Sequence, residues 1–277
     1  MLTPFSNPPI AIDSELYGTL QPTSSLLPEG HSVQSLMVVD GSLNDLDTLM
    51  AGITADAVVV IDPSQDGMDQ VSQMLSNQPQ LELDSLQILS HGDSGTIQLG
   101  TSTLNAQTLS NYSDNLIAWG NSLASTGDVL LYGCNVGAGD DGQAFVQTIS
   151  NLTKADVAAS KNLTGQNGDW ILELKNGEIE ATPSVANAVQ SAYQHTLNLV
   201  QNSGFEDGLG AWTTFTGSET VSTSEANEGG QSLELKANGS GAYQAVSATA
   251  GETYILDAYT KTASSDWSAI GIDFWSE

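Results

Sequence analysis

The sequence has 277 residues, with 33 Asp or Glu against five Lys and no Arg, which gives a formal net charge of −28 at pH 7. Nucleic acids and anionic lipid surfaces bind clustered Lys and Arg, so this balance argues against both as partners. Because 39% of the residues are hydrophobic and only 14% are charged, the composition is that of a folded protein rather than an acidic disordered tail.

Cysteine content and hydropathy set further limits. Cys134 is the only cysteine, which excludes an internal disulfide framework and a cysteine-rich zinc site. No stretch approaches the roughly 18 apolar residues of a membrane span, so no membrane insertion is expected. Residues 1–20 contain neither a basic segment nor a long apolar run, so no Sec signal peptide is predicted. We expect the protein to be secreted or surface-exposed without such a signal, or cytoplasmic if it is not exported.

The chain divides into three regions. Residues 1–32 are rich in Pro, Ser and Thr without a period and predict a loosely ordered leader. Residues 33–197 alternate short apolar runs with amphipathic stretches. In chain order, the pattern predicts a strand at 36–40, a helix at 42–53 capped by Ser42, a strand at 57–62, a helix at 66–77, strands at 85–92 and 96–100, a helix at 105–123, a strand at 128–134, a helix at 141–153, a strand at 155–160, a hairpin of 169–174 with 177–181, and a helix at 185–197.

Strands and helices that alternate in this way predict an α/β fold, with a mostly parallel sheet and helices on both faces. In open α/β sheets, ligands bind outside the carboxyl ends of the strands. Four residues end predicted strands and are therefore candidate site residues: Asp40, Asp62, His91 and Cys134.

Residues 198–277 have a different texture, rich in Gly, Ser and Thr, with predicted strands at 232–237, 242–248, 253–261 and 269–275. Their opening, NSGFEDGLGAW, is similar to that of carbohydrate-binding jelly-roll modules, which implies a carbohydrate partner. About 80 residues are too few for a complete sandwich, and the last run ends in mid-strand. We therefore expect a partial all-β, jelly-roll-like domain, in a chain that is a fragment of a larger protein.

A histidine and a cysteine carry the chemistry of the α/β region. The run LQILSHG ends at His91 and Gly92, and VLLYGC ends at Cys134, 43 residues after the histidine. A thiolate becomes a nucleophile when an imidazole accepts its proton, and the backbone N–H groups of Gly92 and Cys134 could hold an oxyanion. The alternative is that Cys134 is a small buried hydrophobe and His91 a structural residue.

These two runs resemble the caspase-like cysteine peptidase clan, which includes caspases, gingipains, clostripain and toxin self-processing domains. The longer segments VVVIDPSQDG, LQILSHGDSGTIQLG and VLLYGCNVGAGDDGQAFV are similar to the DUF4347 family over about residues 33–197. The resemblance implies a caspase-like fold, Cys134 as nucleophile, His91 as general base, and a polypeptide substrate that includes the protein's own chain. It requires no cofactor. Such domains commonly lie near the N-terminus of large bacterial surface or secreted proteins, so an adhesin-like protein is expected.

The acidic residues refine this expectation. A caspase pocket that selects aspartate uses arginine, which this chain lacks. Basic-specific members of the clan place an acidic residue there, so Asp40 and Asp62 are predicted to line a pocket for Lys or Arg. The alternative is that both aspartates cap the helices that come after them. Ca²⁺ is expected as a structural or activating ion, with Glu206 as one ligand. The competing hypothesis for the whole domain is a catalytically inactive structural or export-related module.

Overall fold

A computed structural model describes residues 10–12, residues 33–198 except Asn167, and part of the chain beyond. The described positions after 198 are 200, 205, 208–210, 212–226, 230–236, 239–246, 258, 260, 261 and 271. The chain forms two compact units, Met1–Gln201 and Asn202–Glu277.

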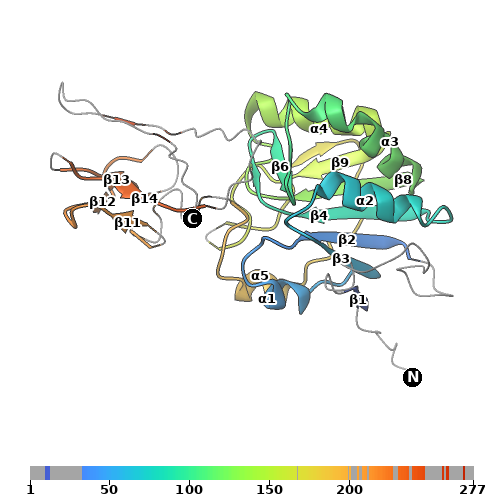
Figure 1. The fold of residues 1–277 in the computed structure, drawn as a ribbon, viewed down its shortest axis with the longest axis horizontal. Coiled ribbons are helices and arrows are strands. Elements are labelled where there is room, and N and C mark those ends of the chain that lie inside the picture. The colour runs from blue at the N-terminus through green and yellow to red at the C-terminus, as the bar shows by residue number, and fades with distance from the viewer. Residues whose placement is uncertain are drawn as a thin grey trace. The chain divides into compact units, whose positions relative to one another are not determined.

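The first unit is built on a seven-stranded sheet with the order β1-β3-β2-β4-β8-β9-β10 (Figure 1). Its strands are β1 (Ile10–Ile12), β2 (Ser35–Asp40), β3 (Ala57–Ile61), β4 (Leu83–Leu89), β8 (Leu123–Tyr132), β9 (Asp156–Ala159) and β10 (Leu174–Asn176). Every neighbouring pair is parallel except β9 and β10, which are antiparallel. The predicted α/β fold with a mostly parallel sheet is confirmed.

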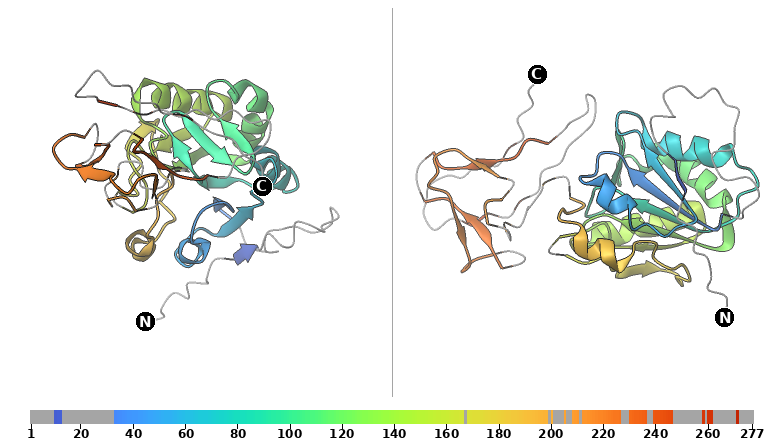
Figure 2. Two further views of the ribbon diagram at one scale, coloured as in Figure 1. Left: turned by 60° about the vertical axis from the view of Figure 1, so that its left-hand side comes forward. Right: turned by 90° about the horizontal axis from the view of Figure 1, so that it is seen from below.

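Helices cover both faces of this sheet. They are α1 (Leu46–Met50), α2 (Gly67–Ser76), the 3-10 helix η2 (Leu109–Tyr112), α3 (Ser113–Asn121), α4 (Gly139–Thr153) and α5 (Asn187–Ala192). Helices α2, α3 and α4 lie on one face, whereas α1 and α5 lie side by side on the other (Figures 1 and 2). Side chains of β2 alternate accordingly: Leu36 and Val38 belong to the core under α2–α4, and Met37 and Val39 belong to the opposite core.

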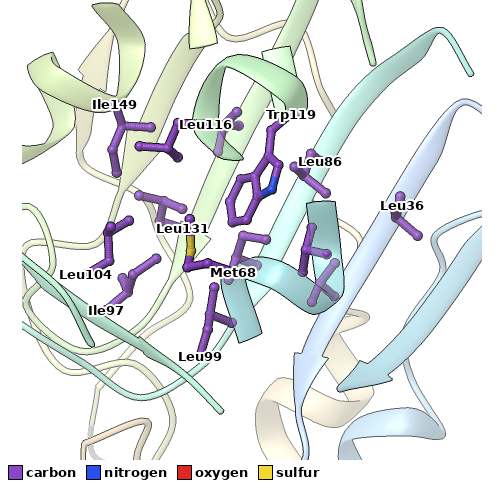
Figure 3. Packing of buried hydrophobic residues seen from close by; sticks show 14 of the residues in the cluster. Leu36, Met68, Leu86, Ile97, Leu99, Leu104, Leu116, Trp119, Leu131 and Ile149 are labelled. Carbon is purple, nitrogen blue, oxygen red and sulfur yellow. The ribbon is translucent and has the colours of Figure 1, made fainter. Parts of the chain in front are cut away.

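The core under α2–α4 is centred on Trp119, which is 1% exposed (Figure 3). Leu116 from the same helix, Met68 of α2 and Leu131 of β8 belong to this core. The indole Nε1 of Trp119 donates a hydrogen bond of 2.9 Å to the hydroxyl of Ser72 on α2. This bond satisfies the single polar group of the indole and ties α3 to α2.

A second, smaller sheet comes directly after His91. It consists of β5 (Gly92–Asp93), β6 (Thr96–Leu99) and β7 (Ser102–Leu104), all antiparallel. The strand predicted at 96–100 is therefore present, but it belongs to this small sheet rather than to the main one. Its buried Ile97 and Leu99 join the core under α2–α4.

The helix predicted at 42–53 is shorter than expected, since α1 begins only at Leu46. The Oδ1 atom of Asp40 accepts a hydrogen bond of 2.7 Å from the backbone N–H of Ser42. The residue before α1 is Asp45, which has a left-handed φ of 50° and makes no side-chain cap. Ser42 therefore lies in a turn held by Asp40 and is not the helix cap. Similarly, the helix predicted at 105–123 begins with the 3-10 turn of η2 and ends at Asn121.

The predicted hairpin of 169–174 with 177–181 is absent: only Leu174–Asn176 forms a strand, and its partner is β9. Trp170 and Leu172 alternate as in a strand, but both are buried against the core on the α5 face. In the region predicted as a leader, β1 adds an edge strand beside β3. The other residues of 1–32 lie outside the described residues.

The second unit contains two short antiparallel pairs in its described part. Strand β11 (Thr213–Thr214) pairs with β14 (Ala242–Tyr243), and β12 (Thr220–Ser222) pairs with β13 (Ser232–Glu234). Phe205 stacks on Trp212, with ring centroids 4.9 Å apart. The strands predicted at 253–261 and 269–275 and the predicted Ca²⁺ ligand Glu206 lie outside the described residues, apart from residues 258, 260, 261 and 271, which are in no strand. The jelly-roll architecture stays a prediction.

Candidate active site

The carboxyl ends of β4 and β8 lie next to each other in the main sheet. Leu89 and Tyr132, the last residues of these strands, are register partners. Because His91 and Cys134 each come two residues later, the sheet brings them to the same edge. Asp40 ends β2, on the other side of β4. Strand β3 pairs with one side of β2, and β4 pairs with the other side. The carboxyl ends of β2 and β4 therefore lie at a topological switch point, which is where α/β sheets bind ligands.

His91 is only 6% exposed, and its Nδ1 atom has no hydrogen-bond partner among the described residues. Burial lowers the pKa of the imidazole, because the charged form is poorly solvated there. The charge of Asp40 opposes this shift, with smaller contributions from the backbone at Ser42 and Leu197. The net effect is a neutral imidazole at neutral pH, which is the form that a general base requires.

Cys134 is fully buried, and its sulfur lies against the backbone of Thr164. The Thr164 N–H donates to Sγ over 3.3 Å, and Sγ lies 3.5 Å from the Thr164 carbonyl oxygen. Burial raises the pKa of the thiol to about 12. In this arrangement the sulfur is protonated and does not face an open cleft. To react, it has to leave Thr164 and lose its proton to a base.

Two backbone N–H groups at this edge converge on a single carbonyl oxygen. The Gly92 N–H donates to the Leu197 carbonyl over 3.0 Å, and the Cys134 N–H donates to the same oxygen over 3.3 Å. These are the two groups that the sequence indicates as oxyanion donors. Two donors on one oxygen are the arrangement that stabilises a tetrahedral oxyanion.

The carbonyl that fills this position belongs to a short extended segment, His195–Leu197. Gln166 N–H donates to the His195 carbonyl over 2.8 Å, and Leu197 N–H donates to the Thr164 carbonyl over 2.9 Å. Between them, Gly165 and Thr196 form an antiparallel bridge. The segment therefore lies along Thr164–Gln166 as an added strand. The sequence pattern assigned it to a helix, but α5 ends at Ala192; the aromatic Tyr193 and β-branched Thr196 are the only local signals for an extended chain.

Glycines allow the chain to pass closely here. A Cβ atom on Gly92 would lie 2.6 Å from the side chain of Val136, and one on Gly133 would lie 3.2 Å from Gly92 Cα. The absence of a side chain at Gly92 therefore lets the loops that follow β4 and β8 pack closely against each other.

The two aspartates expected in a pocket have their oxygens occupied. Asp40 is fully buried, with Oδ1 accepting from Ser42 N–H and Oδ2 from Gly100 N–H over 2.6 Å. Asp62 accepts from the N–H and hydroxyl of Ser64 and from Gln65, and these bonds lower its pKa. Asp62 therefore holds a local turn, and Asp40 holds the turn at Ser42 and also binds the distant Gly100. Neither caps a helix, so the capping alternative is wrong: the residue before α1 is Asp45, and the cap of α2 is Asp66. Of the two, Asp40 is the one whose charge acts on the pKa of His91.

An acidic cluster lies at the opposite edge of the sheet. Asp128 of β8 is the register partner of Asp156, the first residue of β9, and Glu180 completes a set whose ligand atoms are all within 4.8 Å of one another. Asp128 is buried; its Oδ2 accepts from the N–H groups of Glu180 and Ala181, whereas its Oδ1 has no partner among the described residues. Burial and the charges of Glu180 and Asp156 raise the pKa of Asp128.

Sequence reasoning did not identify this cluster. Its signal was two aspartates at the starts of adjacent predicted strands, which a parallel sheet places side by side. A pocket of about 320 Å³ at the same edge is lined in part by Glu180, Asp84 and Ser35. Three carboxylates with a free buried oxygen are a donor set suited to Ca²⁺.

The comparisons with known proteins concern the first unit. The model of the family described as "Domain of unknown function (DUF4347)" matches residues 36–197, which is more than half of the chain. No curated protein sequence matches the chain. Within the part of the chain that the structure describes, no helix has the length and apolar character needed to cross a membrane.

Proposed function

The chain belongs to the DUF4347 family, and from the geometry around Leu197 we propose that residues 33–197 form a caspase-like cysteine peptidase domain that acts on polypeptide, including its own chain. The observation that carries this proposal is the convergence of the Gly92 and Cys134 N–H groups on the Leu197 carbonyl oxygen. The two strands of the caspase-like pattern are also neighbours in the sheet, which the proposed chemistry requires.

The proposed reaction is acyl transfer through a thioester. His91 accepts the proton of the Cys134 thiol, and the sulfur attacks the carbonyl carbon of the peptide bond. The N–H groups of Gly92 and Cys134 hold the resulting oxyanion. His91 then donates the proton to the leaving amine, and a water molecule hydrolyses the thioester with His91 again acting as base.

Cleavage of added peptides tests this function. The purified chain is incubated with a mixed peptide library, and new peptide ends are identified by mass spectrometry. We expect cleavage that falls by at least about 10³-fold in Cys134→Ala and in His91→Gln, because each variant removes a group that acts directly on the reacting atoms. His195→Gln is the matched control: it changes another histidine and should leave the rate within about twofold.

The residue preference before the cleaved bond is a separate part of the proposal. A preference for Lys or Arg rests on the carboxylate of Asp40, which lies close enough to influence His91. Peptides that differ only in Lys, Arg or Leu before the cleaved bond decide between a basic and an apolar pocket. Asp40→Asn should reduce cleavage after Lys selectively if the acidic pocket is used.

The second candidate function is a catalytically inactive structural or export-related module. The full burial of Cys134 and the elevated pKa of its thiol favour this alternative. It predicts that no peptide is cut and that Cys134 resists alkylation under every condition that keeps the chain folded. Cys134→Ala and wild-type protein would then be indistinguishable.

For metal binding, we propose Ca²⁺ at the cluster of Asp128, Asp156 and Glu180. The support is the buried Asp128 oxygen without a partner among the described residues, beside two further carboxylates. Millimolar Ca²⁺ should raise the melting temperature in a concentration-dependent way, since an ion that binds only the folded state stabilises it. Glu180→Gln should weaken this response strongly, whereas Glu178→Gln, an exposed neighbour outside the cluster, should not. Equal responses of both variants would exclude the site.

For the second unit, we propose a partial jelly-roll domain that binds carbohydrate, within a larger adhesin-like protein exported to the cell surface. The support is the NSGFEDGLGAW opening together with the two antiparallel strand pairs. Retention of the chain on immobilised polysaccharides, with elution by the free sugar, tests the binding. Trp212→Ala should reduce retention if the indole contacts sugar, and should leave it unchanged if the indole only packs on Phe205.

A further inference from the structure

We propose that the Leu197–Asn198 peptide bond is the bond that this domain cleaves in its own chain. The inference rests on the proposed peptidase function and adds the identity of its substrate. The carbonyl group of this bond is the one whose oxygen accepts hydrogen bonds from both Gly92 and Cys134. Within the described backbone, no other carbonyl oxygen accepts from this pair of donors.

The backbone N–H and the backbone carbonyl of Leu197 are both hydrogen-bonded. Its N–H donates to Thr164, and its carbonyl accepts from the two loops after β4 and β8. The residues before it pair with Gly165 and Gln166 as an added antiparallel strand. Strand addition is a common way for a protein to hold an extended peptide, because main-chain bonds fix the register while one side chain enters a pocket.

The cysteine shares a partner with this bond. The Thr164 carbonyl accepts from Leu197 N–H and also lies 3.5 Å from Cys134 Sγ, while the Cys134 N–H contacts the Leu197 oxygen. The sulfur of Cys134 therefore lies near Leu197, the residue whose carbonyl carbon it would attack. In the reaction an S–C bond to Leu197 forms, the C–N bond to Asn198 breaks, and the amine of Asn198 takes the proton. Water then releases the Leu197 carboxylate and restores the thiol.

The side chain of Leu197 indicates the preference of the site. It is 0% exposed and belongs to the apolar core on the α5 face, together with Tyr132, Trp170 and Tyr193. For this bond the inference therefore predicts an apolar preference, which the peptides with Lys, Arg or Leu before the cleaved bond distinguish from the basic preference based on Asp40. A Lys in the same position would bury an ammonium group without a partner.

The position of the bond in the chain is consistent with release of the second unit from the first. The family match ends at residue 197, and the second compact unit begins at Asn202. Cleavage would leave the complete family domain on one side and the second unit on the other, with Asn198 as a new N-terminus.

The test uses the full 277-residue chain and reads the products by intact mass and N-terminal sequencing. The chain is purified as the wild type and as Cys134→Ala, and each is incubated at about pH 6 to 9, the range in which a perturbed imidazole can act as base, with and without Ca²⁺. We expect a fragment that begins at Asn198 in the wild type and none in Cys134→Ala. A rate that does not change on dilution would identify cleavage within one molecule.

Two substitutions at the bond test its identity. Leu197→Asp places a charge in the apolar core and should abolish the fragment, whereas Ile171→Asp makes the same kind of change at an exposed position outside the site and should keep cleavage within about threefold. Since Leu197→Asp could unfold the domain, Asn198→Pro provides an independent test. Proline removes the N–H of the leaving group, so we expect a loss of at least about tenfold in cleavage of the chain, whereas the same variant should still cleave added peptides if the domain stays folded.

The outcomes separate this inference from the proposed function. Cleavage at a different bond that still depends on Cys134, or Cys134-dependent cleavage of added peptides with an intact chain, would overturn the inference and keep the peptidase function. If neither the chain nor added peptides are cut under any of these conditions, the peptidase function fails and the inference fails with it. A fragment from Asn198 that persists in Cys134→Ala would indicate a contaminating protease and would contradict both.

Discussion

The protonation of Cys134 is set by its burial, and this has a consequence for stability. The pKa of its thiol is about 12 in the folded chain against 9.0 as the reference value. Because the folded-state pKa is the higher one, the contribution of Cys134 to stability is complete below pH 9 and is lost as the pH rises towards 12. At about pH 10 the loss is about 1.4 kcal/mol, since one unit of pKa corresponds to about 1.4 kcal/mol.

Urea unfolding at about pH 8 and about pH 10 measures this effect. The free energy of unfolding of the wild type should fall more between the two pH values than that of Cys134→Ala, by about 1.4 kcal/mol. Burial also raises the pKa values of Tyr132 and Tyr193, and both proteins contain these residues. The Tyr132 contribution therefore cancels, and that of Tyr193 cancels except for the smaller part that comes from the charge of Cys134. Parallel pH profiles for the two proteins would show that the thiol ionises as readily folded as unfolded.

Gly165 controls how closely the segment of Leu197 can approach its neighbour strand. It has a φ of 107°, and a Cβ atom there would lie 2.3 Å from the His195 carbonyl oxygen. Gly165→Ala should therefore cost about 1–3 kcal/mol and loosen His195–Leu197. Hydrogen exchange of the Leu197 amide should speed up in the same variant.

Gly217→Ala is the matched control for this substitution, because Gly217 also has a positive φ but a Cβ atom added there would have no atom within 4 Å. Gly217→Ala places alanine at a positive φ but creates no steric clash, so it should lower the free energy of unfolding less than Gly165→Ala does. Faster exchange at Leu197 in this control, or none in Gly165→Ala, would disprove the role of Gly165.

Among single residues, the sequence predicted the site residues that end strands. It did not predict the residues from distant segments that contact them. His91, Gly92 and Cys134 come directly after apolar runs and could be identified locally. Thr164 and Leu197 come from segments about 30 or more residues beyond Cys134, and nothing in their local pattern predicts that they pair with each other. Such contacts depend on the tertiary path of the chain, which periodicity does not encode.

Among the elements, α2 and α3 are joined by hydrogen bonds to the Ser72 hydroxyl and by one from Asn115 to Asp69. Ser72 Oγ accepts from Trp119 Nε1 over 2.9 Å and from Asn115 Nδ2 over 3.0 Å. Ser72→Ala leaves the buried indole N–H without its partner, which should cost about 1–3 kcal/mol. Ser76→Ala, an exposed position on the same helix, should change the free energy of unfolding by less than about 0.5 kcal/mol. Thermal or urea unfolding measures both, and equal effects would refute the role of Ser72.

The elements that periodicity predicted well are those with a strong hydrophobic signal. Strands β2, β3 and β9 coincide with near-continuous apolar runs, and α2 and α4 have clear amphipathic patterns. Strand β8 contains the predicted apolar run but begins at Leu123, five residues before the predicted strand. The errors have specific physical causes. Asp40 captures the N–H of Ser42 and delays α1, while Trp170 and Leu172 alternate like strand residues but are buried in the core without a ladder. Side-chain hydrogen bonds and tertiary burial both override a local pattern.

Across the whole molecule, 33 acidic residues are accompanied by only five lysines, which leaves the net charge of −28. Among the described residues the ion pairs are Lys236–Glu234 and Lys261–Glu225, both exposed and both in the second unit. The carboxylates of the first unit therefore repel one another with little relief from lysine. This repulsion favours expanded states and is strongest at low ionic strength.

Monovalent salt should therefore stabilise the first unit without any specific ion site. Between about 10 mM and about 1 M NaCl the screening length falls from about 30 Å to about 3 Å, so repulsion between separated carboxylates is largely removed. We expect the melting temperature in the presence of a chelator to rise by several degrees over this range. The double variant Glu82→Gln, Glu178→Gln removes two exposed charges and should melt higher than the wild type at the low salt concentration, with the difference shrinking at the high one. A melting temperature that is flat or falling with NaCl, or a variant that gains nothing at low salt, would mean that the repulsion is already compensated in the folded chain.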